Sequence, residues 1–482
     1  MEISRKNRDP KLYLFLSLSY LQLSIFFNLS WAFSPLDNYL IDCGSYSTVD
    51  VDNRYFVGDS SKSGSVFLSA TRTISLKNQN PSLGSSPLYH TARVFTKPSN
   101  YEFEIKKNGI HLVRFHFLPF SESKYNLSDA QFHVSVHGFL LLSNFSVVDR
   151  KTPVLKEYLI WVDSGKLVIS FMPWRDSSIA FVNAIEVISA PEDLIADTAR
   201  FVSSDRIENC DGLTKQALET VYRITMGGPK VTPFNDSLWR TWIPDDGFLK
   251  SKAALETVYF SGRIQYQRGG ASREIAPDNV YNTARVTNNR NVSMPDFNIT
   301  WGFPVSSGYK YLVRMHFCDI VSMSTYLLYL DIYINGNLAY KDLGLSELTN
   351  GMLAAPYYAD FVVYGDSSRV LSISIGASSL GVRGISKAIL NGLEIMKMNN
   401  SMGSLDGELS VDSVLKSWPK GNIGILVPLV AVISLLIVAF AVIYRRRTEL
   451  KDSVVWSPLP VDVSKGNLKY INQLSSGKLG FL

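Results

Sequence analysis

The chain has 482 residues, of which 46% are hydrophobic and 19% are charged, and its formal net charge is +5. Plentiful apolar residues and modest charge exclude a disordered or collagen-like chain, and three cysteines exclude a disulfide-dense scaffold. Residues 1–11 have a net charge of +2, residues 445–482 have +4, and the rest has −1. A nucleic-acid-binding protein would carry positive charge on a folded face, so this distribution argues against that class.

The first apolar run predicts a secretory signal peptide. It extends from Leu12 to Leu29 behind a basic cluster and ends at Ser30-Trp31-Ala32. This ending places small residues at the −3 and −1 positions of a cleavage site after Ala32. We therefore expect residues 1–32 to be removed. The alternative is an uncleaved N-terminal anchor, because the run is longer than the usual apolar core of a signal peptide.

Residues 33–421 contain an internal repeat. The matched pairs are Leu88–Val94 with Val280–Val286 at an offset of 192, His111–Phe117 with Tyr311–Phe317 at 200, and Val182–Ile188 with Leu390–Met396 at 208. The order is kept and the offset drifts slowly, as small loop insertions would produce. We therefore predict two copies of one module, at residues 33–195 and 206–398, with the charged segment 190–211 joining them.

Each copy is predicted to be mainly β-strand. Apolar and polar residues alternate in Phe132–His137, Leu167–Phe171, Leu330–Ile334 and Leu371–Ile375. A period of two with β-branched and aromatic residues is typical of half-buried strands. Many short strands without long helices favour a β-sandwich of jelly-roll type in each module.

Five aromatic residues are candidate ligand contacts, because sandwich proteins bind sugars with exposed rings beside polar groups. They are Tyr89, Trp239, Trp242, Tyr281 and Trp301. Most strand aromatics serve the core instead, and that alternative stays open for each of them.

Other chemistry is sparse. His116 and His316 occupy equivalent places in the repeat, and we favour a structural role for both over a ligand contact. No His or Cys cluster supports a metal site, and no cofactor is implied. Asp245 and Asp246 are adjacent in a Pro-Asp-Asp-Gly turn, whereas the two carboxyls of a glycosidase face each other across a bond. We therefore expect a polar turn there, and a membrane-anchored wall hydrolase is a remote alternative.

The region between the two apolar runs carries extracellular features. Its six N-x-S/T sequons, which we expect to be glycosylated, are Asn126, Asn144, Asn235, Asn291, Asn298 and Asn399. An oxidising compartment permits one disulfide between two of Cys43, Cys210 and Cys318, and the sequence does not say which two.

The C-terminal part predicts a single membrane span. Residues 399–421 are rich in Ser, Gly and Asp and predict a stalk, and residues 422–444 carry no charge. About 20 apolar residues can cross the hydrocarbon core of a bilayer as a helix. Arg445-Arg446-Arg447 follow at once, so the positive-inside rule places the short tail, residues 445–482, in the cytosol. We expect a single-pass type I plasma-membrane protein whose apolar helix contacts membrane lipid.

Seven motifs keep their order along the chain: Tyr39–Ser45, Glu219–Pro229, Leu238–Trp242, Asp245–Leu249, Tyr281–Arg285, Arg314–Asp319 and Ile389–Glu394. Together they resemble the ectodomain of plant malectin-like receptor-like kinases of the FERONIA and THESEUS type. The resemblance implies tandem malectin-like jelly rolls on the plant cell surface. It also implies that secreted signalling peptides, GPI-anchored co-receptors and cell-wall pectin are partners.

Members of that family carry a cytosolic serine/threonine kinase, and its motifs are missing here. The residues after Tyr444 contain no glycine-rich loop, no V-A-I-K lysine, no H-R-D and no D-F-G. We therefore expect no enzyme activity from this polypeptide. Two hypotheses remain. The chain is a receptor-like protein that binds an extracellular ligand and signals through a partner or acts as a decoy, or it is the truncated product of a receptor kinase gene.

Overall fold

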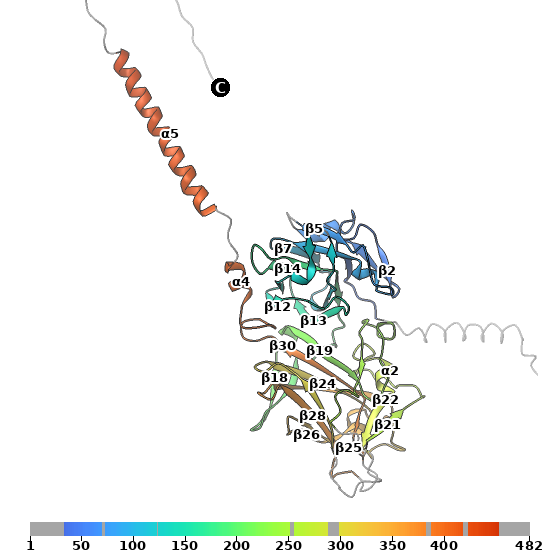
Figure 1. Ribbon diagram of the computed structural model, residues 1–482. Helices are drawn as coiled ribbons and strands as arrows, with labels where there is room; N and C mark the ends of the chain where they lie inside the picture. Colours follow the sequence, from blue (N-terminus) through green and yellow to red (C-terminus); the bar gives the residue numbers. More distant parts are fainter. Residues whose placement is uncertain are drawn as a thin grey trace, which may run out of the picture. The chain divides into compact units, whose positions relative to one another are not determined.

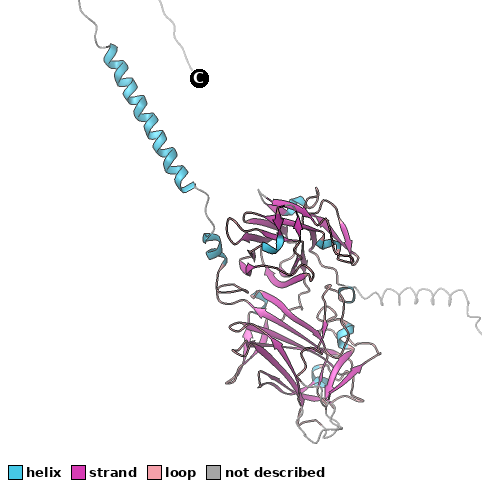
Figure 2. Cartoon of the chain, in the orientation of Figure 1, coloured by secondary structure: helices cyan, strands magenta, loops and turns pink. Residues whose placement is uncertain are grey.

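The computed structural model describes residues 33–69, 73–122, 124–250, 255–287, 298–381, 387–417 and 423–452. The predicted signal peptide, the sequon at Asn291 and most of the predicted tail lie outside the described residues. The chain divides into two compact units, Met1–Ser417 and Trp418–Leu482. The first unit consists of β-strands with a few short helices (Figures 1 and 2).

One long sheet runs through both predicted modules. Its strands from the first module are, in spatial order, β13 (Val154–Val162), β8 (Gly109–Phe117), β16 (Ala184–Ser189), β1 (Asn38–Asp42), β3 (Arg54–Gly58) and β2 (Val49–Val51). Those from the second module are β18 (Ile207–Asp211), β17 (Thr198–Val202), β27 (Pro356–Tyr364), β24 (Lys310–Cys318), β30 (Gly392–Met398) and β19 (Leu218–Thr225), with β20 (Ile243–Pro244) paired to β19.

The two halves of this sheet join where β13 pairs antiparallel with β19. The register places Tyr158 opposite Glu219 and Leu159 opposite Leu218. Because backbone pairing continues across this point, the modules share one sheet instead of being connected by a free linker.

Smaller sheets cover one face of the long sheet. In the first module they are β12 (Phe139–Phe145), β11 (Phe132–Val136), β14 (Lys166–Pro173), β7 (Ser99–Glu104) and β4 (Leu68–Ser69); β15 (Ala180–Val182), β6 (Thr91–Phe95) and β5 (Thr73–Lys77); and the pair β9 (Ser121–Glu122) and β10 (Tyr125–Asn126). In the second module they are β23 (Ile299–Pro304), β28 (Val370–Ala377), β25 (Tyr329–Ile334) and β26 (Asn337–Gly344), and β21 (Leu255–Tyr259), β22 (Thr283–Thr287) and β29 (Ile389–Leu390).

Helices are short in the described part of the first unit. They are α2 (Asp278–Tyr281), α3 (Leu345–Leu348) and α4 (Val411–Ser417), with 3-10 turns η1 (Ser65–Phe67), η2 (Pro87–Tyr89), η3 (Leu127–Asp129), η4 (Leu213–Lys215) and η5 (Pro233–Asn235). The sandwich prediction is confirmed, and the alternating segments form β11, β14, β25 and β28.

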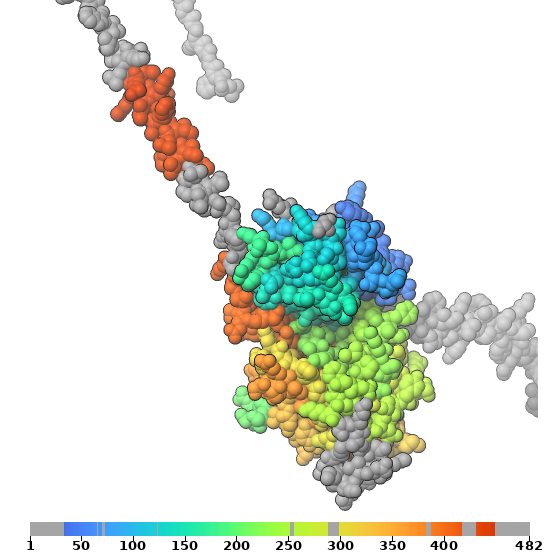
Figure 3. Space-filling model, viewed as in Figure 1, coloured from blue at the N-terminus to red at the C-terminus, as the bar shows by residue number. Residues whose placement is uncertain are grey.

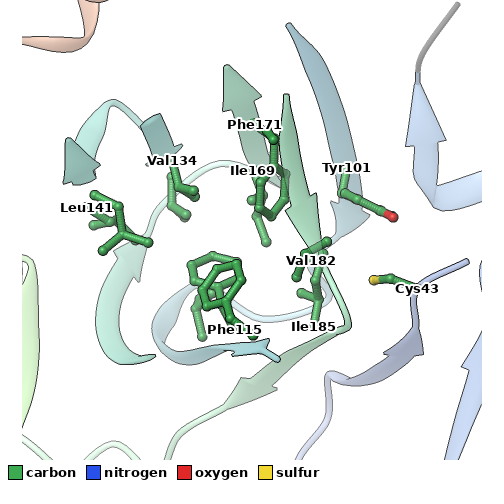
Figure 4. Close-up of a cluster of buried hydrophobic side chains, with 14 of the residues drawn as sticks. Cys43, Tyr101, Phe115, Val134, Leu141, Ile169, Phe171, Val182 and Ile185 are labelled. Carbon is green, nitrogen blue, oxygen red and sulfur yellow. The ribbon is translucent and has the colours of Figure 1, made fainter. Parts of the chain in front are cut away.

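Successive side chains of the central strands point to opposite faces of the long sheet, and they therefore pack into three separate cores. In β8, Val113, Phe115 and Phe117 point into the first module's core. Figure 4 shows Phe115 from β8 facing Phe171 and Ile169 from the small sheet. The intervening residues Ile110 and Leu112 belong to a different cluster on the opposite face, which both modules share. This shared core is closed by the segment 231–281, which carries Leu238, Trp242 and Tyr281.

Two connecting segments have structure that their composition did not indicate. The segment expected to join the modules folds into the hairpin β17–β18, and β17 pairs parallel with β27 of the second module. Its backbone donors and acceptors are thereby satisfied within the sheet, which a charged composition alone did not indicate.

The predicted stalk packs against the first module over residues 399–417. Leu405 is fully buried in the first module's core, and its backbone N–H donates to the Leu140 carbonyl at 2.8 Å. The Asp406 carboxylate accepts from the Ser143 N–H at 2.9 Å, and Val414 of α4 packs on Met172. Figure 3 shows this orange segment against the green and teal surface of the first module.

The described part of the second unit is one helix, α5 (Ile423–Asp452). It contains most of the predicted span. None of the helices in the described ranges meets the length and apolarity required of a bilayer-crossing segment.

Leu405→Ala should destabilise the first module although the residue follows the second module in the chain. Removing a fully buried leucine leaves a cavity and costs about 2–5 kcal/mol. Urea denaturation of residues 33–417 measures the loss. Leu409→Ala is the control, because Leu409 is 45% exposed. Equal midpoints for the two variants would contradict the packing of this segment.

Candidate functional site

A hydrogen-bonded Tyr–His–Glu chain, whose histidine and glutamate are buried, occurs once in each module. The Tyr89 hydroxyl lies 3.1 Å from His116 Nδ1, and His116 Nε2 lies 2.8 Å from Glu186. Tyr281, His316 and Glu394 repeat the arrangement, at 3.1 Å and 3.2 Å. These residues are the repeated motifs of the sequence, so the duplication preserves a hydrogen-bonded chain. The structural role expected for both histidines agrees with this burial.

A second buried cluster is also duplicated. Asp59 accepts from Arg93 Nη2 at 2.6 Å and from the Gly44 N–H at 2.7 Å. In the second module, Asp245 accepts from Arg285 Nη2 at 2.9 Å and from the Gly227 N–H at 3.0 Å. 

The two equivalent glycines have positive φ, +83° at Gly44 and +68° at Gly227. A Cβ on either would lie within 2.8 Å of a carbonyl oxygen of the facing strand, Ala92 or Ala284. Glycine is therefore required at this close approach.

The expected polar turn at Asp245-Asp246 is half correct. Asp246 is exposed, whereas Asp245 is fully buried against Arg285. A buried carboxylate needs a charged or hydrogen-bonded partner. Arg285 lies 40 residues further along the chain, so the sequence did not identify it as the partner of Asp245.

A ladder of alternating charges crosses the module junction on the face of the shared core. Arg114 Nη1 lies 3.0 Å from Glu186 Oε2, and Arg114 Nε lies 2.7 Å from Glu157 Oε2. Arg223 of β19 continues the ladder, at 2.7 Å from Glu157 of β13 and 2.8 Å from Glu394. Every member is nearly inaccessible to solvent, so each charge depends on its neighbours in the ladder.

Burial by itself raises the pKa of Glu157, but Arg223 and Arg114 outweigh it and hold the pKa at about 2. Burial lowers the pKa of His316, although the carboxylate of Glu394 acts to raise it. These shifts describe a structural network, because none of the groups lies at an open surface.

Three of the five predicted ligand contacts are core residues. Trp242, Tyr281 and Trp301 are fully buried, and the indole N–H groups of Trp242 and Trp301 donate to Asp236 and Asp245. They present no ring face to solvent, because each ring fills the space between the long sheet and its cover. Tyr89 and Trp239 are half-buried, and for these two the ligand contact stays a prediction.

The cysteines form no disulfide, which corrects that expectation. All three thiols are free, and Cys43 and Cys318 are fully buried. Figure 4 shows Cys43 beside Tyr101 at one end of the first core. Among the described sequons, Asn144, Asn235 and Asn298 are exposed, whereas Asn126 and Asn399 are half-buried.

The first of two junction cavities has a volume of about 860 Å³ and lies mainly in the second module. Its lining includes Arg200, Tyr340, Tyr358, Asp360 and Ser272. Two rings are fixed by cations, because the Arg200 guanidinium lies 3.9 Å from the Tyr340 ring and that of Arg314 lies 4.3 Å from the Tyr358 ring.

The second cavity has a volume of about 720 Å³ and lies at the end of the first module. Phe33, Leu36, Ile110 and Trp161 provide apolar lining, and Lys107 and Glu192 form an exposed ion pair at its rim. None of these cavity residues is among the five candidate ligand contacts. They come from segments far apart in the chain, so only the folded topology brings them together.

Comparison with known proteins identifies the family. A model of the malectin-like domain matches residues 41–398. The chain belongs to the malectin-like family. Over 457 residues it is 39% identical to receptor-like protein kinase HERK 1 of Arabidopsis thaliana, covering 93% of this chain and 54% of the relative. Over 386 residues it is 40% identical to THESEUS 1 of the same plant, covering 80% and 44%.

Another relative, a probable receptor-like protein kinase of Arabidopsis thaliana, is 42% identical over 437 residues, covering 89% of this chain and 52% of the relative. The chain thus spans about half the length of the curated relatives it matches. The relatives are kinases, and the malectin-like match lies in the ectodomain part of this chain.

Solved structures agree with the fold. The crystal structure of the ANXUR1 extracellular domain from Arabidopsis thaliana aligns with a TM-score of 0.68 and 31% identity, covering 77% of this chain and 99% of that one. A crystal structure of plant peptide RALF23 in complex with FER and LLG2 aligns with a TM-score of 0.67 and 31% identity, covering 78% and 99%. The predicted resemblance to FERONIA- and THESEUS-type ectodomains is confirmed.

Glu157→Gln should change how stability depends on pH. The pKa of Glu157 is about 2 in the folded protein and about 4.3 in an unfolded chain. The stabilisation by this carboxylate is therefore complete above about pH 4.3 and is lost as pH falls through about 2. Breaking a buried ion pair costs about 3–5 kcal/mol, so the free energy of unfolding of wild type should exceed that of the variant by this amount at pH 7.

Urea denaturation from pH 7 to pH 2 measures the free energy of unfolding of wild type and of Glu157→Gln. The difference between the two should shrink below about pH 4.3. Glu192→Gln is the matched control, because it removes the exposed partner of Lys107. Parallel curves for wild type and Glu157→Gln would contradict the role of the ladder.

Proposed function

We propose that this chain is a cell-surface receptor-like protein whose tandem malectin-like ectodomain binds an extracellular ligand. The observation that carries the proposal is the match of the whole tandem region to the ectodomain in the complex of RALF23 with FER and LLG2. A secreted peptide with a GPI-anchored co-receptor is the ligand class that this relative supports. Signalling then passes through a partner, or the chain acts as a decoy.

The architecture is suited to binding. The continuous sheet holds two cavities of several hundred Å³ at fixed positions, and preformed cavities lined by rings and a few polar groups are typical ligand sites. Cell-wall polysaccharide, above all pectin, is a second ligand class, because Tyr89 and Trp239 are only half-buried. A hydrolase is disfavoured, since both acids considered for it are bound by Arg285 Nη2 at 2.9 Å and Asp245 is fully buried.

Saturable binding of RALF23 to residues 33–417, tightened by LLG2, is the expected result of isothermal titration calorimetry. The corresponding region of a relative crystallises as an isolated extracellular domain, so the fragment is a sound reagent. De-esterified pectin oligomers are titrated in parallel. Heat-denatured fragment serves as the control, and absence of saturable binding to both ligand classes would contradict the proposal.

We further propose that the apolar segment at residues 422–444 anchors the chain and that the ectodomain passes through the secretory pathway. The full chain expressed in plant cells should stay in the membrane pellet after alkaline carbonate extraction, and deletion of 422–444 should release it. Glycans should occupy the exposed Asn144, Asn235 and Asn298, because their side chains are accessible in the folded ectodomain. Site-resolved mass spectrometry after enzymatic deglycosylation measures occupancy. A soluble, unglycosylated full chain would contradict this topology.

The alternative of a truncated receptor kinase product leaves the ectodomain's function unchanged. It is supported by the half-length match to the curated relatives. Sequencing the transcript beyond the codon for Leu482 decides it, since an open frame with H-R-D and D-F-G motifs would establish a kinase.

A further inference from the structure

The two cavities share one lining residue, Asp193, in the segment that connects the modules. Trp161 of β13 and Tyr358 of β27, which line one cavity each, pack against the shared core. Tyr340 and Tyr357, which also line the first cavity, pack against the second module's own core, so this cavity extends around the edge of the sheet. The two cavities meet at Asp193, and together they form one trough. We define the trough by Trp161, Asp193, Arg200 and Arg268.

The chemistry of the trough changes along its length. The end in the first module is apolar, with Phe33, Leu36, Ile110 and Trp161 in its lining. The side chain of Leu36 is 57% exposed although it borders a cavity. An apolar side chain seated there would cover it, and burial of apolar surface is favourable.

The centre of the trough is acidic. Asp193 is exposed and has no ion-pair partner among the described residues, whereas the neighbouring Glu192 is paired with Lys107. A free carboxylate at the point where the cavities meet favours a cation or an N–H donor from a ligand.

The end in the second module is cationic and polar. Arg200 and Arg268 are exposed, and neither has a carboxylate partner among the residues that the structure describes. Asp360, which also lines this end, is already bound by Arg314 at 2.7 Å. The Ser272 hydroxyl is buried in the wall without a hydrogen-bond partner in the described structure. These groups together suit a carboxylate with an adjacent polar atom.

We propose that the trough binds an extended peptide segment that presents an apolar side chain, then a basic group, then a carboxylate. This inference rests on the proposed ligand-binding function and names the ligand class of one site. A peptide fits better than a polysaccharide. A homopolymer presents the same groups along its whole length, whereas the trough is apolar at one end, acidic at its centre and cationic at the other end. The long sheet holds both ends, so the ligand meets a preformed surface.

The test is selection of a phage-displayed random dodecapeptide library on residues 33–417. Enriched peptides should contain an apolar residue, a basic residue and an acidic residue or free C-terminus in that order. The dissociation constant of one labelled, enriched peptide is then measured by fluorescence anisotropy. The double variant Arg200→Glu with Arg268→Glu should weaken binding at least about tenfold, and Asp193→Lys should also weaken it.

Arg175→Glu is the matched control. Arg175 lies 3.8 Å from the Trp174 ring, much as Arg200 lies 3.9 Å from the Tyr340 ring, but it lines neither cavity. This variant should bind the peptide as wild type does. A peptide in which the acidic residue is changed to Lys should regain affinity for the Arg200→Glu, Arg268→Glu variant, which a folding defect cannot produce.

Several results would overturn the inference. They are failure to enrich any peptide, equal affinity of wild type and the double variant, or oligogalacturonides that compete for the trough while peptides do not. RALF23 binding that survives the double variant, with no peptide enriched, would leave the proposed function intact and remove the trough from it. Loss of all ligand binding by the folded wild-type fragment would remove both.

Discussion

The pairing of β13 with β19 is the constraint on which the first unit depends. Only two facing residue pairs make the junction, and a buried charge ladder reinforces it through Arg223, which binds Glu157 of one module and Glu394 of the other. Removing Arg223 would leave Glu394 buried without its guanidinium partner and Glu157 buried with Arg114 alone, which is far more costly than losing a surface ion pair. Relative rotation of the modules would break the ladder, so the ladder opposes such rotation.

The repeated sequence motifs supply a large part of the buried polar network. Tyr-His-Thr-Ala-Arg and Tyr-Asn-Thr-Ala-Arg supply the tyrosines and the arginines of the two duplicated clusters. The histidine strands supply the partners of the tyrosines, whereas the arginines bind Asp59 and Asp245 outside the matched segments. A buried polar group must keep its partner, whereas an apolar core residue can be exchanged for another of similar volume. Divergence between the two copies has therefore left the polar positions easiest to align, and these are the positions from which the duplication was inferred.

Local alternation predicted the strands well, because β11 and β25 each have one buried face whose period shows in the sequence. Long-range placement could not be predicted in the same way. Trp242 and Trp301 are aromatic residues beside polar ones in sequence, and only the covering segment and Asp245 show that they are interior. The 399–417 segment has the composition of a stalk, yet Leu405 and Val414 bury it against the first module. The trough residues carry no local pattern, because their proximity is a property of topology.

The hairpin β17–β18 limits the number of modules that one continuous sheet can join. Glu157 of β13 and Asp360 of β27 each face the equivalent arginine of the neighbouring strand, so the two strands hold the same place in their modules. The outer edge of β13 accepts β19 and thereby a whole module, whereas the outer edge of β27 accepts only the hairpin. The exposed strand of that hairpin bears Glu208 and Asp211, which discourage further pairing. A head-to-tail geometry that could in principle continue as a filament is thus terminated after two repeats by a five-residue strand and its partner.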